Sequence, residues 1–463
     1  MNVIPAAVIT PAVMIDVDIL DRNIERMASS MRGRGLGLRP HVKTHKTLEI
    51  ARRQLAAGAV GITVATIGEA EVFAADGVKD IFIAYPLWVE APHAERLRAL
   101  AAQCRLAVGV DSAESATAMG RQLGADAGSI EVLIEVDSGH HRSGVLPDEV
   151  GDVARAASSA GLKVGGVFTF PGHSYKPGMP TGAASNENES LGLAAATLTS
   201  AGFDVKTISG GSTPTALISG ESTATELRPG VYVFGDAQQL ELERCGWEDV
   251  ALTVAATVVS RHEARGGNVR RVVLDAGSKV LGSDRPEWAT GYGRLPEYPE
   301  AKLTALSEHH ATVVWPESSE LPPLGTRLRV IPNHVCLTMN LVDEVTVVRS
   351  GKLWSSGPWR RGDGTTRQDC LLRSPADPKA PDRCTAWRGI ATLTRPNWRT
   401  TGCSRVIEGI LRTRPEEVPV PDGPILLGYH VIAGYMSRVN GRFFESWGRS
   451  PISLHDQILH NGC

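Results

Sequence analysis

The sequence lacks several features that would assign it to a specialised class of protein. Its 463 residues include only seven cysteines, an odd number at irregular spacing, which argues against a disulfide framework. No apolar run approaches the roughly 18 residues that cross a bilayer, and residues 1–10 lack the basic stretch of a signal peptide. The net charge of −3 gives no basic excess for binding nucleic acid. We therefore expect a cytoplasmic protein without a nucleic-acid or membrane partner.

Between residues 12 and 235 the sequence alternates apolar runs with helical patterns. Buried parallel strands form continuous Val, Ile and Leu runs, and about eight such units favour a closed (β/α)8 barrel over an open sheet. The expected strands are Val13–Asp16, Leu38–Lys43, Gly61–Thr66, Asp80–Pro86, Leu106–Asp111, Ile130–Asp137, Val164–Phe170, Val205–Gly210 and Gly230–Phe234. The expected helices include Ile19–Met31, Leu48–Ala57, Ile67–Ala75 and Ala91–Ala102.

The pattern changes twice after the barrel region. Short β-type runs separated by turns, such as Ala251–Ser260 and Glu344–Arg349, predict a second, mostly antiparallel β-domain. Residues after 350 hold four of the seven cysteines but no clear periodicity, and we assign this tail no fold. The predicted fold class is therefore α/β, with a barrel at residues 1–245, a β-domain at 246–350 and an unassigned tail at 351–463.

Lys43 is the first candidate for chemistry, in the segment RPHVKTHK at residues 39–46. The carboxyl ends of parallel strands meet on one face of a barrel, where active sites lie. On an extended strand Arg39, His41 and Lys43 would share one side. A lysine among such cations has a lowered pKa and can attack an aldehyde as a free amine. A solvated lysine remains the alternative, and Lys46 is expected to begin the next helix.

Three further segments could bind a phosphorylated ring. In ISGGSTPTA (residues 208–216), the Ser209-Gly210-Gly211 turn and the following hydroxyls could hold a phosphate, although an ordinary helix N-cap has the same composition. In TELRPGVYVFGD (225–236), Arg228 and Gly230 could complete that site. In IEVLIEVDSGHHRSG (130–144), Arg142 could donate to a phenolate oxygen.

His334 and Cys336, in IPNHVCLTMN (residues 331–340), are a candidate metal-binding pair. Two residues apart on a strand, they would face the same way and could reach one ion. A thiolate with an imidazole favours zinc, and two protein ligands suit an open catalytic site. The pair alone is not specific, so the residue pattern leaves the metal open.

Taken in this order, the segments resemble the fold-type III pyridoxal-phosphate enzymes, which combine an alanine-racemase-like barrel with a β-domain. Within them the chain is most similar to the D-serine dehydratase and D-threonine aldolase group. The resemblance covers residues 10–350 and rests on the segments TPAVMIDVDILDRNI, RPHVKTHK, GITVATIGEAEV, Val273–Lys279 and LSEHH.

The resemblance implies individual roles. Lys43 matches the lysine that carries the cofactor as a Schiff base, Arg142 the arginine at the phenolic oxygen, and Arg228 the arginine facing the pyridine nitrogen. His310 matches a histidine to which we assign no role. The residues expected to bind the cofactor are Lys43, Arg142, His173, Tyr175, Ser209, Gly210, Gly211, Ser212, Thr213, Arg228, Gly230 and Val231.

His334 and Cys336 decide the subgroup, because dehydratase members carry a His-x-Cys zinc pair, whereas aldolase members usually have Asp at the second ligand. The resemblance thus implies a homodimeric, zinc-dependent dehydratase that converts D-serine or a related D-3-hydroxy amino acid to a 2-oxo acid and ammonia, with Lys43 removing the α-proton. Two alternatives stay open. One is retro-aldol cleavage to glycine and an aldehyde, and the other is a non-catalytic protein that binds pyridoxal phosphate.

Overall fold

The structure, a computed structural model, describes residues 4–354 and the backbone of residues 359–360. Eight parallel strands form a sheet in the order β2-β9-β8-β7-β6-β5-β4-β3. The two edges meet, because the Thr63 N–H donates to the Pro40 carbonyl at 2.8 Å and His41 forms a parallel bridge with Thr63. The predicted closed barrel is therefore confirmed. Its strands are β2 (Gly37–Leu38), β3 (Ile62–Val64), β4 (Asp80–Pro86), β5 (Arg105–Val110), β6 (Glu131–Glu135), β7 (Lys163–Phe168), β8 (Thr207–Gly210) and β9 (Glu226–Leu227).

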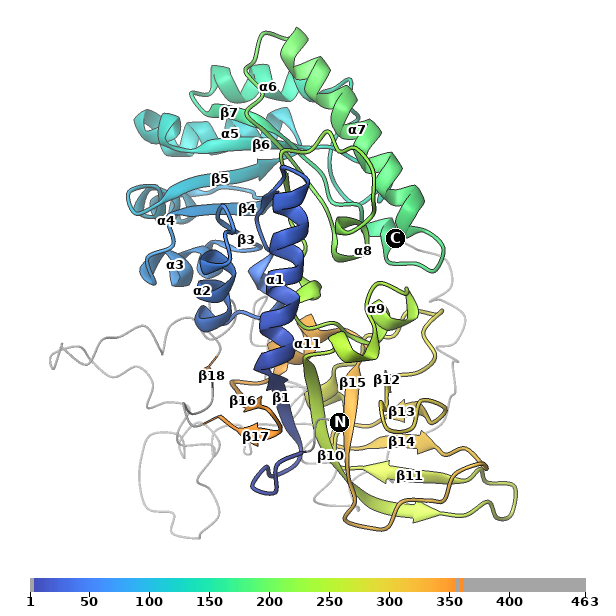
Figure 1. Cartoon of the computed structure of the whole chain (residues 1–463). Coiled ribbons are helices and arrows are strands. Elements are labelled where there is room, and N and C mark those ends of the chain that lie inside the picture. Colours follow the sequence, from blue (N-terminus) through green and yellow to red (C-terminus); the bar gives the residue numbers. More distant parts are fainter. Residues whose placement is uncertain (1–3, 355–358, 361–463) are drawn as a thin grey trace, which may run out of the picture. The chain divides into compact units, whose positions relative to one another are not determined.

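Helices alternate with these strands along the chain and pack on the outer side of the barrel (Figure 1). Helix α1 shows why: Asp16 caps its first turn through the N–H groups of Asp18 and Ile19, and apolar residues at helical spacing, from Leu20 to Met31, are buried. The helices are α1 (Val17–Gly33), α2 (Leu48–Ala56), α3 (Ile67–Ala75), α4 (Ala91–Ala101), α5 (Ala113–Leu123), α6 (Val150–Ser159), α7 (Pro180–Ser200), α8 (Thr213–Ala216), α9 (Ala237–Glu241), α10 (Ser278–Leu281) and α11 (Val335–Leu341).

The second sheet has ten strands and is antiparallel except for the pair β1–β16. Its strands are β1 (Ala12–Asp16), β10 (Leu252–His262), β11 (Arg271–Leu274), β12 (Gly293–Arg294), β13 (Lys302–Leu306), β14 (Ala311–Val314), β15 (Arg327–Pro332), β16 (Glu344–Arg349), β17 (Lys352–Leu353) and β18 (Trp359–Arg360). This confirms the mostly antiparallel β-domain, whereas its boundaries at residues 245 and 350 stay a prediction.

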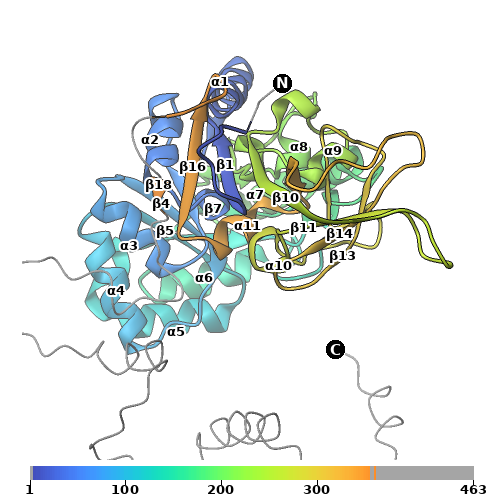
Figure 2. The same cartoon turned by 90° about the horizontal axis from the view of Figure 1, so that it is seen from below.

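Strand β1 corrects the sequence interpretation. The sequence pattern predicts that Val13–Asp16 is a barrel strand, but this run pairs with β10 and β16 in the second sheet, as Figure 2 also shows. The first strand of the chain is thus separated from the barrel that its own helix α1 covers. An apolar run buried in either sheet has the same composition, so the sequence does not distinguish the two positions.

Three other runs form different elements from those expected. Leu38–Lys43 is a strand only at its start, because Pro40 has no N–H, and Lys43 lies in a 3₁₀ turn, η1 (Val42–Thr44). Gly230–Phe234 contains another 3₁₀ turn, η4 (Val231–Val233), and the barrel strand β9 precedes it. His334 and Cys336 are not on a strand, since β15 ends at Pro332 and α11 begins at Val335.

Residues 355–358 and 361–463 lie outside the described residues, and with them almost all of the tail that was assigned no fold. Within residues 4–354, none of the helices has both the length and the apolar character that crossing a bilayer requires.

Candidate active site

A cavity of about 280 Å³ lies where the barrel strands end. His41 follows β2, Phe170 follows β7 and Arg228 follows β9, so these residues line it from the carboxyl ends of their strands. The cavity is lined by His41, Lys43, Thr44, Phe170, Gly172, Tyr175, Ser212, Thr213, Arg228, Gly230, Val231, Gln238, Asp284, His334 and Cys336. Of the predicted site residues, Arg142, His173, Ser209, Gly210 and Gly211 do not line it.

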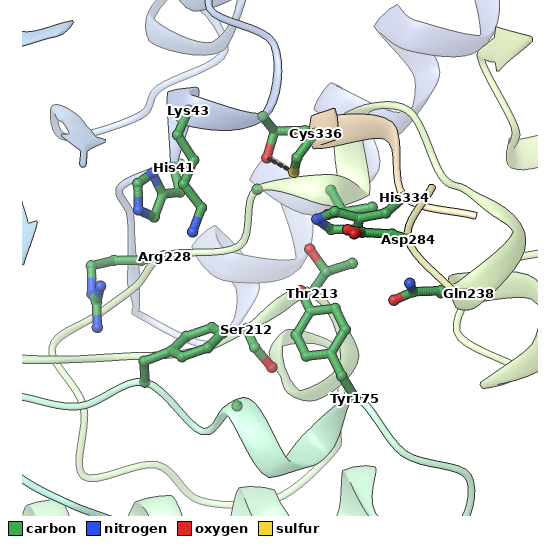
Figure 3. Close-up of a pocket in the computed structure, with 15 residues that line it drawn as sticks. His41, Lys43, Tyr175, Ser212, Thr213, Arg228, Gln238, Asp284, His334 and Cys336 are labelled. Carbon is green, nitrogen blue, oxygen red and sulfur yellow. Dashed lines mark hydrogen bonds between the residues drawn. The ribbon is translucent and has the colours of Figure 1, made fainter. Parts of the chain in front are cut away.

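Lys43 extends its amine into this cavity (Figure 3). The Nζ atom lies 6.0 Å from the centre of the Phe170 ring. His41 lies beside it, and burial, with added repulsion from Lys43 and Arg228, lowers the pKa of His41 well below its usual value. His41 is therefore neutral at pH 7. Arg39 is not the neighbouring cation that strand alternation predicted.

Arg39 instead lies inside the barrel, away from the cavity. Its Nη1 lies 2.6 Å from Asp80 Oδ1 and its Nε 2.8 Å from Glu226 Oε2, and only about 4% of Arg39 is exposed. These ion pairs join three barrel strands, so the role of Arg39 is structural.

Hydrogen bonds connect the Lys43 segment to the segment that contains η4. His45 Nδ1 accepts the N–H of Thr47 at 3.0 Å, and burial lowers the pKa of His45 to about 4. The neutral ring therefore carries its hydrogen on Nε2, which donates to Gln54 Oε1 at 3.1 Å. Gln54 in turn donates to the Tyr232 hydroxyl at 3.0 Å, and the Tyr232 N–H donates to Thr213 Oγ1 at 3.1 Å. The lysine segment, through His45 and Thr47, and the Thr213 hydroxyl are thus joined in one buried network.

The Ser-Thr turn after β8 presents hydroxyls to the cavity. Ser212 is the N-cap of α8, and its hydroxyl lies 2.9 Å from that of Ser174. Gly211, with φ of 87°, lies behind this turn, and its N–H donates to the buried carboxylate of Glu187. Ser209 donates to Glu226 at 2.8 Å in the barrel interior. Ser209 and the glycine pair therefore lie outside the cavity lining, and the hydrogen bonds of Ser209 and Gly211 hold the turn in position.

Arg228 is a buried cation that lines the cavity. Its guanidinium lies 5.6 Å from the ring centre of Phe82 and 5.3 Å from that of Phe168, and it donates to the Thr169 carbonyl. Burial lowers its pKa to about 10, so it stays charged at pH 7. The Nε atom is buried without a hydrogen-bond partner among the described residues. An acceptor in the cavity would satisfy this N–H group.

Arg142 and His173 lie near the cavity without lining it. The Arg142 guanidinium lies 5.3 Å from the centre of the Phe170 ring, which is itself part of the lining. Both ring nitrogens of His173 are buried without a hydrogen-bond partner in the part of the chain that the structure describes. Tyr175 does line the cavity, and burial raises the pKa of its hydroxyl, which therefore stays protonated. His310 lies exposed in the turn between β13 and β14.

His334 and Cys336 reach the cavity from the start of α11 (Figure 3). Cys336 Sγ lies 3.3 Å from Thr44 Oγ1, and His334 Nδ1 lies 3.5 Å from Asp236 Oδ2. Burial alone would raise the pKa of the Cys336 thiol, but His334 outweighs it and the net pKa is lowered. Among residues 4–354 no group of three or more His, Cys, Asp or Glu side chains is arranged to hold a metal ion. The pair therefore suits an open site rather than a closed structural one.

Several functional positions were missing from the sequence prediction. His41 stands in the lysine motif and could have been included for that reason. Asp236 ends the quoted segment 225–236 and could have been included for that reason, whereas Gln238 and Asp284 lie outside every quoted segment and nothing in the pattern marks them. Glu187 lies on α7 among other polar residues, and only the fold brings it to the Ser-Thr turn.

A closed parallel barrel with Lys43 at its mouth, beside a mostly antiparallel domain, is the architecture of the fold-type III pyridoxal-phosphate class. The family model for the alanine racemase N-terminal domain matches residues 15–238, and that for a putative serine dehydratase domain matches residues 251–348. The chain belongs to the family of D-3-hydroxy amino acid dehydratases and aldolases built on this fold.

Three relatives illustrate the family. D-threo-3-hydroxyaspartate dehydratase of Delftia is 39% identical over 356 residues, 71% of this chain and 91% of its own length. Its cysteine-to-alanine variant, solved in a metal-free form, has a TM-score of 0.69 at 35% identity and covers 77% of this chain and 98% of its own. D-threonine aldolase of Arthrobacter is 32% identical, and the match covers 75% of this chain and 90% of the aldolase. D-serine dehydratase of Dictyostelium discoideum is 28% identical, and the match covers 74% of this chain and 93% of that dehydratase. All three relatives are by name lyases of small hydroxy amino acids, and together they support a lyase activity for this chain.

Proposed function

We propose that this protein is a pyridoxal-phosphate- and zinc-dependent dehydratase of D-serine or a related D-3-hydroxy amino acid, giving the 2-oxo acid and ammonia. The observation that best supports it is that Lys43 shares one cavity with His334 and Cys336 (Figure 3). Dehydration needs a base for the α-proton and an acid for the departing β-hydroxyl, and an amine and a metal-binding pair can supply the two.

The residues present fit pyridoxal phosphate. Lys43 would hold it as a Schiff base, the Ser212 and Thr213 hydroxyls would bind its phosphate, and the unpaired Nε–H of Arg228 offers a buried donor. Gly230 lets its segment pack closely against the lysine segment, because a Cβ there would lie 2.6 Å from Thr44 Oγ1 and 3.0 Å from the His41 carbonyl oxygen. The bound cofactor supplies an electron sink for negative charge at Cα of the substrate.

The residues around Lys43 suit it to proton transfer. Once freed by the substrate, the Lys43 amine would accept the proton from Cα. His41 is neutral because of its lowered pKa, and Tyr175 retains its hydroxyl proton because of its raised pKa. The Tyr175 hydroxyl can therefore donate a hydrogen bond into the cavity, whereas the neutral His41 ring is hydrogen-bonded to the Thr63 backbone.

His334 and Cys336 would hold the zinc ion, whose chemistry there is that of a Lewis acid toward the β-hydroxyl oxygen. Despite burial, the pKa of the Cys336 thiol is lowered by the charged His334 beside it. Binding of the ion would release the His334 proton, since a metal ligand must be a thiolate or a neutral imidazole. Asp236 faces Nδ1 of His334 and would leave Nε2 for the ion, an arrangement common among metal-binding histidines. The metal-free form of the Delftia cysteine variant further supports a metal-binding cysteine.

The first test replaces Lys43 by alanine. After reconstitution with pyridoxal phosphate, Lys43→Ala should lack the absorption band of the lysine-bound cofactor and its turnover. Lys163→Ala is the matched control, because Lys163 begins β7 at the opposite end of the barrel and is exposed. A Lys43→Ala protein that retains both the band and turnover would show the assignment to be wrong.

The second test combines metal analysis with a panel of D-serine, D-threonine and D-threo-3-hydroxyaspartate. A dehydratase forms 2-oxobutyrate from D-threonine, whereas the aldolase alternative, which the Arthrobacter relative represents, forms acetaldehyde and glycine. Cofactor binding without turnover of any member would favour the non-catalytic alternative. The homodimer is part of the proposal, and sedimentation at about twice 49.4 kDa would support it.

A further inference from the structure

Lys46 is buried behind the cavity in an unusual backbone conformation. It is about 8% exposed, and its φ of 49° lies in the left-handed region that side chains other than glycine rarely adopt. The sequence predicted that it would begin the next helix, but α2 starts only at Leu48. Such a conformation persists only where the surrounding contacts hold the residue in place.

The Lys46 side chain joins segments that are far apart in the sequence. Its Nζ donates to Asn340 Oδ1 at 2.8 Å and lies 3.6 Å from Glu69 Oε1. Glu69, on α3, is itself fixed, because its Oε2 accepts the N–H of Ala65 at 2.8 Å. Asn340 lies in the last turn of α11. Lys46 therefore connects the segment after η1 to both α3 and α11.

Helix α11 is thus hydrogen-bonded to the lysine segment near both ends of the helix. Near its start, Cys336 Sγ lies 3.3 Å from Thr44 Oγ1, and near its end Asn340 accepts from Lys46. The helix has seven residues, so contacts near its two ends fix its orientation as well as its position.

We propose that Lys46 is a positioning residue which, with Asn340 and Glu69, holds α11 against η1 and so sets the separation between Lys43 and the His334–Cys336 pair. This inference rests on the proposed function, which gives that separation its chemical meaning. A reaction that takes a proton at one carbon and releases a hydroxyl from the next needs base and acid at a fixed spacing.

A charged side chain is suited to this task. The Lys46 and Glu69 side chains are only 10% and 3% exposed, so removing one partner leaves the other charge without compensation in a poorly solvated place. Lys46→Met keeps the length of the side chain and removes its charge. Lys46→Arg keeps the charge and should recover part of the function. Asn340→Leu removes the acceptor on α11 and leaves the Lys46–Glu69 pair intact.

The experiment measures zinc affinity by competition with a chromophoric chelator, the absorption band of the lysine-bound cofactor, and kcat and KM. We expect Lys46→Met to keep the band, to bind zinc about tenfold more weakly, and to lose more in kcat than in KM. Lys46→Arg should lie between Lys46→Met and wild type. The double variant Lys46→Met with Asn340→Leu should bind zinc only slightly more weakly than Lys46→Met alone, because each substitution removes the same Lys46–Asn340 hydrogen bond.

Arg96→Met is the matched control. Arg96, on α4, lies 2.7 Å from Glu71 on α3, the helix that also holds Glu69. Neither residue lines the cavity and the pair is partly exposed, so its loss should change the melting temperature only slightly and leave zinc affinity unchanged. If Lys46→Met behaves like this control, the inference is overturned while the proposed function stands. A wild-type chain that binds no zinc overturns both. If Lys46→Met does not fold, Asn340→Leu carries the same comparison, since Asn340 is exposed.

Discussion

Replacing Glu187 by glutamine should make the stability of the cofactor-free protein less dependent on pH. Glu187 is about 6% exposed, and its carboxylate accepts the Gly211 N–H and, at 3.3 Å, the Thr215 hydroxyl. Burial, the largest cause, raises its pKa from 4.5 to about 7. Glutamine keeps an acceptor for Gly211 and carries no charge, so the substitution removes the titration with little change in shape.

The direction of this pH dependence follows from how tightly the folded and unfolded states bind the Glu187 proton. The folded carboxyl binds its proton more tightly than the unfolded one, so the folded state loses stability as pH rises from 4.5 to 7, and the loss is complete above pH 7. At 1.36 kcal/mol per pH unit, the rise to about 7 corresponds to about 3 kcal/mol. For a protein of this size that is on the order of 4 °C in melting temperature.

The assay compares melting temperatures of wild type and Glu187→Gln between pH 5 and 8.5, both without cofactor. Subtracting one curve from the other removes the contributions of all other titrating groups. The two proteins should melt together near pH 5, and Glu187→Gln should melt higher near pH 8. Parallel curves over the whole range would refute the reasoning, because they would mean that the Glu187 carboxyl titrates alike in the folded and unfolded states.

Three further substitutions separate metal binding, packing and stability. Asp236→Asn removes the charge that faces His334 Nδ1 and should weaken zinc binding at least tenfold in a chelator competition assay. Gly230→Ala would place a Cβ 3.0 Å from a backbone carbonyl oxygen, so cofactor affinity measured by absorption titration should fall, together with about 1–3 kcal/mol of stability. Arg39→Met leaves Glu226 buried without its partner and should cost about 3–5 kcal/mol in unfolding experiments, while zinc affinity stays unchanged.

The barrel could be predicted because its strands are buried on both faces and its helices on one. Asp80–Pro86 and Ile67–Ala75 have the bounds expected from their apolar patterns. The sequence did not predict which sheet a strand joins, because that depends on the strands with which it pairs. Val13–Asp16 is as apolar as a barrel strand, yet its neighbours are β10 and β16, whose positions depend on the whole fold.

In the candidate site, too, local patterns predicted some features, whereas others depend on tertiary contacts. The spacing of His334 and Cys336 predicted a common direction on a strand, whereas His334 is the N-cap of a helix and has extended backbone angles. An N-cap residue is outside the helical repeat, so its side chain can still face the cavity beside Cys336. The glycine pair lies outside the cavity lining, where Glu187, distant in sequence, accepts the Gly211 N–H.

The contacts of Lys46 could not be predicted from the sequence around it. It stands three residues after Lys43, within the segment that carried the family resemblance, but its partners Glu69 and Asn340 belong to two other helices. The amine and the metal-binding pair also come from opposite ends of the folded region, so no local pattern can specify the distance between them. That distance depends on tertiary contacts, and a substitution at Asn340 should therefore alter the reaction even though Lys43, His334 and Cys336 are all retained.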